Sequence, residues 1–219
     1  MKKFFLITLM ILAAAYGISA QNGVIRELTG DVELKRSGSQ AFTAASAGDE
    51  VTRDTIVSTG FKSTAVIAVG SSMITVRPLT RLSLAEIQSS SGTETLNVNL
   101  QAGRVRVDVK PPAGAKANCT VQSPSATASV RGTSFDFDTI NLTVNEGTVA
   151  FSGVSGPIAM VKSGGANFVG IEGKPVDTAN IIASVLLPSA PVGSSASGTI
   201  QPSAPSTGDL GIIIEYPKK

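Results

Sequence analysis

The stretch Ala128-Ser-Val-Arg-Gly-Thr-Ser-Phe-Asp-Phe-Asp138 sets the fold that we expect for this chain. Its two phenylalanines alternate with two aspartates, which is the period-two pattern of a strand with one buried and one solvated face. Phe135 and Phe137 should therefore point inward, and the aspartates outward. Gly132 interrupts the alternation and permits a backbone turn that other residues disfavour. We expect a strand, a corner and a second strand.

The same alternation extends in both directions from this stretch. Valines and leucines alternate with polar residues over 96–101 and 104–110, and Gly70-Ser71-Ser72 supplies a turn between two apolar runs. Gly30, Gly103 and Gly147 each open a further alternating segment. These glycines fit stacked strand-turn-strand coils, and they equally fit ordinary tight turns. The pattern predicts an all-β domain over residues 21–175.

The composition excludes several classes of chemistry. The chain has no histidine, which removes Ser-His-Asp and Cys-His catalysis and most catalytic zinc sites. Without Lys2 and Lys3 the basic and acidic residues are equal in number, so a clustered positive surface for nucleic acid is not expected. No catalytic residue, metal ligand or cofactor site can be placed. The single Cys119 is expected to be a buried apolar residue, the alternative being a reactive thiol.

Three groups of polar residues have a structural and a functional interpretation. Arg131 could bind an anion, although an ion pair with Asp136 or Glu146, or bonds to corner carbonyls, is favoured. Oxygen ligands for calcium occur close together but lack EF-hand spacing, so polar turn positions are favoured. Basic side chains on 104–110 are expected to form a solvated strand face. The candidate calcium ligands are Asp136, Asp138, Asn141 and Asn145. The basic side chains are those of Arg104, Arg106 and Lys110.

The two ends of the chain differ from its centre. Residues 1–20 read as a secretory signal peptide cleaved after Ala20, with a basic start and an apolar run too short for a membrane span. Residues 176–187 have the apolar stripe of a short helix, with Asp177 as the N-cap candidate. A linker rich in Pro, Ser, Ala and Gly is expected over 188–208, and a strand-like tail over 209–219. We therefore expect an exported protein without a membrane span after signal cleavage.

The central motif resembles that of the FecR domain family, whose signature is Val-Arg-Gly-Thr-x-Phe. Here the matching residues are Val130, Arg131, Gly132, Thr133 and Phe135. The segments Gly48 to Leu84, "NLQAGRVRVDV" and "VNEGTVAFSG" are similar to further family motifs, so the resemblance covers about residues 24–160. It implies a periplasmic all-β fold, a solenoid-like stack of short strands in two facing sheets. The residue pattern also fits an antiparallel β-sandwich.

The resemblance implies a role in signalling. The founding members of the family carry a cytosolic anti-sigma part and a periplasmic part that senses an occupied outer-membrane receptor. This sequence shows neither a later membrane span nor a cytosolic part, so it is more similar to stand-alone envelope members of the family. We expect a non-catalytic binding or signalling-associated module that is periplasmic or at the cell surface. Its partner would be an unknown envelope protein or cell-wall component, and the alternative is a structural surface or matrix component.

Overall fold

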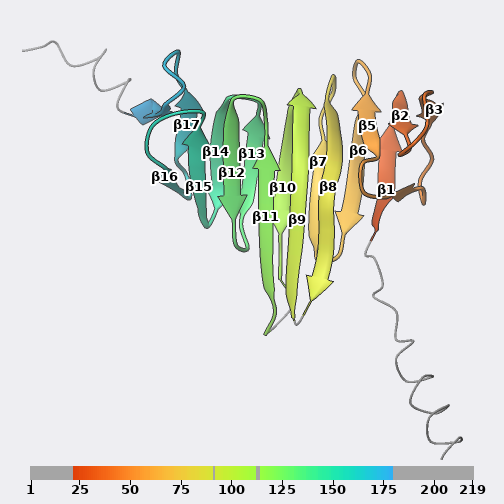
Figure 1. The fold of residues 1–219 in the computed structure, drawn as a ribbon, viewed down its shortest axis with the longest axis horizontal. Coiled ribbons are helices and arrows are strands. Elements are labelled where there is room, and N and C mark those ends of the chain that lie inside the picture. Colours follow the sequence, from red (N-terminus) through yellow and green to blue (C-terminus); the bar gives the residue numbers. More distant parts are fainter. Residues whose placement is uncertain (1–21, 91, 112–113, 180–219) are drawn as a thin grey trace, which may run out of the picture. The chain divides into compact units, whose positions relative to one another are not determined.

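The computed structural model describes residues 22–90, 92–111 and 114–179 (Figure 1). These residues form eighteen β-strands in two facing sheets of nine strands each. The all-β prediction is therefore confirmed for the part of the chain that the structure describes. Among the described residues, no helix is long and apolar enough to cross a membrane.

Each sheet is a continuous row of hydrogen-bonded strands. Sheet A contains, in spatial order, β18 (Pro175–Asp177), β17 (Ala166–Val169), β14 (Asn141–Glu146), β13 (Ser134–Asp138), β10 (Arg104–Val109), β7 (Ser72–Val76), β6 (Thr64–Val69), β1 (Gly23–Thr29) and β4 (Glu50–Val51). Sheet B contains β16 (Ala159–Lys162), β15 (Thr148–Gly153), β12 (Ala126–Val130), β11 (Lys116–Gln122), β9 (Thr93–Ala102), β8 (Arg81–Ser90), β5 (Ile56–Thr59), β2 (Val32–Lys35) and β3 (Thr43–Ala44).

The chain alternates between the sheets and advances along both of them. From β5 onward it crosses repeatedly between sheet B and sheet A, so that strands distant in sequence lie at opposite ends of each sheet (Figure 1). Neighbouring strands are antiparallel except β9 and β11, which are parallel because β10 between them lies in the opposite sheet. The steady advance fits the solenoid prediction and the antiparallel pairing fits the sandwich prediction, so both remain open.

The core lies between the sheets and follows from the period-two alternation. Phe135 and Phe137 are fully buried, as their alternation with aspartates predicts. Phe137 meets Phe151 of β15 edge to face with ring centres 6.2 Å apart, so the two sheets contact each other through aromatic rings. Cys119 is 1% exposed and burial raises the pKa of its thiol to about 12. The prediction of a buried apolar cysteine is confirmed, and the thiol is protonated at neutral pH.

The three glycines that open alternating segments lie where the chain crosses between sheets. Gly30 follows β1, Gly103 follows β9 and Gly147 follows β14, and the next strand belongs to the other sheet in each case. Their φ angles are 73°, 91° and 85°. Each glycine lies against a buried hydroxyl residue at a second crossing, so every one of these corners joins two crossings. The hydroxyl residues are Ser63, Thr80 and Thr133 respectively.

The predictions for the chain ends fall largely outside the described residues. They concern the signal peptide at 1–20, the linker at 188–208 and the tail at 209–219. Of the helix expected over 176–187, only residues up to 179 are described, and strand β18 extends to Asp177. These predictions stay predictions.

Candidate functional site

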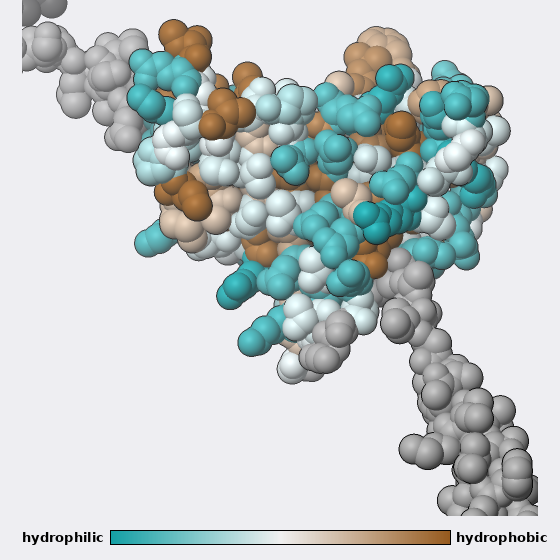
Figure 2. Space-filling model, in the orientation of Figure 1, coloured by the Kyte–Doolittle hydropathy of each residue, from teal (hydrophilic) through white to brown (hydrophobic). Residues whose placement is uncertain are grey.

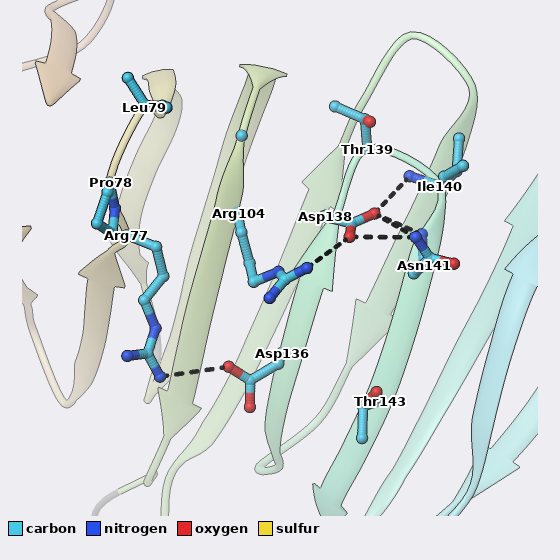
Figure 3. Close-up of a pocket in the computed structure, with 11 residues that line it drawn as sticks. Arg77, Pro78, Leu79, Arg104, Asp136, Asp138, Thr139, Ile140, Asn141 and Thr143 are labelled. Atoms are coloured by element: carbon cyan, nitrogen blue, oxygen red, sulfur yellow. Dashed lines mark hydrogen bonds and ion pairs between the residues drawn. The ribbon is translucent and has the colours of Figure 1, made fainter. Parts of the chain in front are cut away.

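A wide hollow lies on the outer face of sheet A, and we call it the sheet A groove (Figure 3). It has a volume of about 980 Å³ and runs from Arg77, just after β7, across the strands β10, β13 and β14. Arg77 and Arg104 reach over its floor, Asp136 and Asp138 face them, and Leu79 and Ile140 stand at its rim. The groove therefore combines charged and apolar surface.

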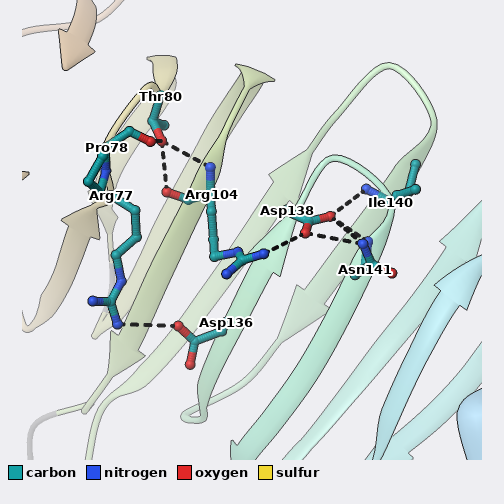
Figure 4. A network of polar contacts seen from close by, with 8 residues as sticks. All are labelled: Arg77, Pro78, Thr80, Arg104, Asp136, Asp138, Ile140 and Asn141. Atoms are coloured by element: carbon teal, nitrogen blue, oxygen red, sulfur yellow. Dashed lines mark hydrogen bonds and ion pairs between the residues drawn. The ribbon is translucent and has the colours of Figure 1, made fainter. Parts of the chain in front are cut away.

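Strand pairing brings the charges of the groove together. In the register of β10 and β13, Arg104 lies opposite Asp138 and Arg106 lies opposite Asp136. The Arg104 Nη2 to Asp138 Oδ2 distance is 3.2 Å, and Arg77 Nη2 lies 3.7 Å from Asp136 Oδ1 (Figure 4). Arg104 and Arg106 have the same spacing as Asp138 and Asp136 on the neighbouring strand, so the four side chains form cross-strand ion pairs. Because these pairs are partly exposed, each contributes little to stability.

Asp138 is held as a carboxylate by several donors. Its Oδ1 accepts hydrogen bonds from the backbone N–H of Asn141 at 2.8 Å and of Ile140 at 3.2 Å. The Asn141 side chain also donates to Asp138, as Figure 4 shows. Partial burial acts to raise the pKa of Asp138, but these hydrogen bonds and Arg104 outweigh it and the pKa is lowered. The group is ionised at neutral pH and is a poor proton donor there.

The corner between β7 and β8 exposes an apolar side chain at the rim of the groove. Leu79 is 63% exposed and has a φ of 56°, a left-handed conformation that costs a non-glycine residue about 1–2 kcal/mol. Thr80, next to it, is buried, and its Oγ1 accepts a hydrogen bond of 2.9 Å from the backbone N–H of Arg104. The anchored threonine fixes this corner and leaves Leu79 facing solvent.

The oxygen residues considered for calcium are used in two separate contacts. Asp138 binds Asn141 and Arg104, whereas Asp136 accepts a hydrogen bond of 2.9 Å from Asn145 and lies beside Arg77. Each carboxylate therefore already has an amide and a guanidinium as partners. Among the described residues, no group of three or more Cys, Asp or Glu side chains is placed to hold a metal ion.

The predicted motif of Val130, Arg131, Gly132, Thr133 and Phe135 forms the corner between β12 and β13. Gly132 has a φ of 72°, and Val130, Thr133 and Phe135 are buried, as expected for a structural corner. The preferred interpretation of Arg131 is wrong. Arg131 is exposed and forms no ion pair or hydrogen bond with the described residues.

Neither expected partner of Arg131, Asp136 or Glu146, forms an ion pair with it among the described residues, and Asp136 is engaged elsewhere. Asp136 lies on the outer face of sheet A beside Arg77 and Arg106, while Arg131 lines a hollow beside residues of sheet B. Sequence proximity misled here, because the chain crosses between the sheets at Gly132 and separates the two residues. Thr133 Oγ1 is also buried without a hydrogen-bond partner among the described residues.

Comparison with known proteins identifies the centre of the chain. Residues 55–150 match the family model described as FecR protein, and this range contains the groove's ion pairs and the Arg131 corner. The chain contains a FecR domain. No curated protein matches the chain.

Two solved structures are similar to this chain in fold. Both are crystal structures of a proposed anti-sigma factor from Parabacteroides distasonis ATCC 8503, each at 13% sequence identity and a TM-score of 0.46. They cover 59% and 56% of this chain, and the chain covers 64% and 58% of theirs. The chain thus spans less than two thirds of the length of these solved chains.

Sequence reasoning missed the rim and one arginine of the groove. Arg104 and Arg106 were singled out as a solvated strand face, and Asp136 and Asp138 as polar turn positions, so the two sets were not paired with each other. Their matching Arg-x-Arg and Asp-x-Asp spacing was a usable signal for adjacent strands. Nothing in the sequence around Leu79 indicates that its side chain is left exposed, because a leucine beside two strands is normally counted as core.

Proposed function

We propose that this chain is a non-catalytic, exported module of the cell envelope that takes part in signalling by binding a partner protein through the sheet A groove. The FecR domain supports a signalling-associated role, since its family is generally non-catalytic and envelope-associated. Export rests on the pattern of residues 1–20, with a periplasmic or cell-surface location after cleavage.

The observation that carries the binding role is the mixed surface of the groove. Exposed Leu79 and Ile140 lie at the rim of a floor whose arginines and aspartates are already paired. A partner can bury the two apolar side chains without leaving an unpaired charge in the interface, which would be costly. Protein-binding surfaces usually combine apolar side chains with polar and charged ones.

The groove is not arranged for proton transfer. A general acid or base that acts near neutral pH needs a pKa close to that pH, and the pKa of Asp138 is shifted down instead. Asp136 is likewise occupied by Asn145 and Arg77. This supports binding over catalysis as the role of the groove.

Partner capture from envelope extract tests the proposal. The variant Leu79→Asn removes the apolar rim, and asparagine tolerates the left-handed φ at this position, so the fold should be preserved. We expect the purified chain to retain a specific envelope protein and Leu79→Asn to lose it. Asn99→Ala on the outer face of sheet B is the matched control and should retain the partner.

Retention of the same protein by Leu79→Asn would place the binding surface elsewhere. Absence of any retained protein, together with copurification of the chain with cell-wall material, would support the alternative of a structural surface component. That alternative draws on the outer face of sheet B, which over β11 and β12 presents Asn118, Thr120, Thr127 and Ser129.

A further inference from the structure

A second hollow lies beside Arg131, next to the strands of sheet B, and we call it the Arg131 hollow. It has a volume of about 740 Å³. Polar side chains from three segments line it, together with one exposed apolar residue from a fourth. Those used in the argument are Asn118, Thr120, Ser129, Arg131, Thr148 and Met160.

The Arg131 hollow has an uncompensated positive charge. Arg131 is the one charged residue of its described lining, and the lining contains no carboxylate. Arg77 and Arg104 of the sheet A groove each lie within ion-pair distance of an aspartate, whereas Arg131 has no such partner among the described residues. Lys162 adds a nearby cation, since it lies opposite Thr148 in the register of β15 and β16. The local charge favours an anionic ligand.

The remaining lining indicates which kind of anion fits. Asn118, Thr120 and Thr148 offer amide and hydroxyl groups that can hydrogen-bond to a peptide backbone. Met160 is 64% exposed and can pack against an aliphatic side chain. No aromatic ring is among the described lining residues, so the hollow lacks the stacking platform on which sugar-binding surfaces usually rely. Apolar surface lies at this end of the domain, around β16 and β17 (Figure 2).

We propose that the Arg131 hollow binds an acidic peptide segment of a partner protein. A carboxylate of the peptide binds the Arg131 guanidinium, whose planar fork matches a carboxylate in two parallel hydrogen bonds. A neighbouring aliphatic side chain of the peptide packs on Met160. The corner formed by Gly132 and Thr133 places the arginine, and the arginine binds the ligand.

This site is separate from the sheet A groove and does not rest on the proposed function. The lining of the hollow shares no residue with the lining of the groove. Leu79→Asn should therefore leave peptide binding at Arg131 unchanged, and Arg131→Gln should leave capture through the groove unchanged. The two proposals can fail independently.

Fluorescence anisotropy with a labelled peptide of alternating glutamate and leucine tests the site. We expect the purified chain to bind this peptide and to bind its glutamine-and-leucine counterpart at least about tenfold more weakly. Arg131→Gln should raise the dissociation constant about tenfold or more, because the charge-assisted hydrogen bonds are lost. Arg26→Gln is the matched control, since Arg26 is also exposed and its change removes the same charge from sheet A.

Several outcomes would overturn the site. Equal losses in Arg131→Gln and Arg26→Gln would show a general charge effect, and equal binding of both peptides would remove the role of the carboxylate. Polygalacturonate, a carboxylated glycan, is tested in the same assay as an alternative ligand. If it binds through Arg131 while the peptide does not, the hollow takes a carboxylated glycan and the peptide proposal is wrong. A loss in Met160→Ser that is smaller than the loss in Arg131→Gln supports the proposed pose.

Discussion

The corner at Thr80 and the corner at Thr133 contain the same pair of residue types in two different states. In each, a threonine lies against a glycine of the opposite crossing, Gly103 in the first and Gly147 in the second. Thr80 Oγ1 accepts a hydrogen bond from the Arg104 backbone N–H. Thr133 instead presents its methyl group to Gly147, and its hydroxyl has no partner among the described residues.

The difference shows that the two threonines share a packing role but not a hydrogen-bonding role. Thr80 connects two crossings through hydrogen bonds and so fixes the corner that carries Leu79. Thr133 connects its crossings by packing, with its backbone carbonyl accepting a bond from Val109 N–H. The contacts that hold each corner are internal, and each corner leaves one residue exposed, Leu79 in the first and Arg131 in the second.

The largest effect should come from the buried residue two positions after each threonine. Phe135 follows Thr133 and Leu82 follows Thr80, and both are fully buried. Phe135→Ala should lower the free energy of unfolding by about 3–5 kcal/mol, and Leu82→Ala by about 2–5 kcal/mol. Urea melts measure both values. A cost below about 1 kcal/mol for either would contradict the assignment of the motif to the core.

Gly103→Ala and Gly147→Ala should lower the stability of the protein by different amounts. A Cβ at Gly103 would lie 2.6 Å from Leu79 O, a backbone atom, whereas a Cβ at Gly147 would lie 2.6 Å from Thr133 Cγ2, a side-chain atom that moves when the χ1 angle changes. Both φ angles are left-handed, which costs alanine about 1–2 kcal/mol. Gly103→Ala should add about 1–3 kcal/mol of overpacking. Equal melting midpoints for the two variants would show that the corners are equally tolerant.

Thr80→Val and Thr133→Val should differ in their effect on the free energy of unfolding. Thr80→Val leaves the Arg104 backbone N–H without its acceptor and should cost about 1–3 kcal/mol. Thr133→Val keeps the shape and removes a hydroxyl that has no partner among the described residues, so it should be neutral or stabilising. The unfolding free energies of the pair give the test. If Thr133→Val is as costly as Thr80→Val, the Thr133 hydroxyl has a partner in solution.

The sequence was sufficient for the fold class and for the inward and outward faces. Alternation placed Phe135, Phe137 and Cys119 in the core, and Gly132, expected to permit a turn that other residues disfavour, has a φ of 72°. These features depend on local period and backbone preference, which neighbouring residues determine. The family resemblance is also confirmed, by the match over residues 55–150.

The sites could be predicted only in part, because they depend on which strands become neighbours. Arg104 and Asp138 lie 34 positions apart and meet only through the pairing of β10 with β13. Arg131 and Asp136 are close in sequence, yet the crossing at Gly132 places Asp136 on sheet A and Arg131 beside sheet B. A single sequence contains the spacing of charges but not the order of strands, so it could not exclude the wrong ion pair.

The unfolding free energy of Arg131→Gln tests most directly whether the motif divides into a structural corner and an exposed binding residue. Arg131 is exposed and makes no ion pair among the described residues, so the substitution should change the free energy of unfolding by less than about 0.5 kcal/mol. The same sample should bind the acidic peptide more weakly. A decrease of more than about 1 kcal/mol in the free energy of unfolding, measured by a urea melt, would contradict the account. Arg131 would then stabilise the corner instead of only binding a ligand.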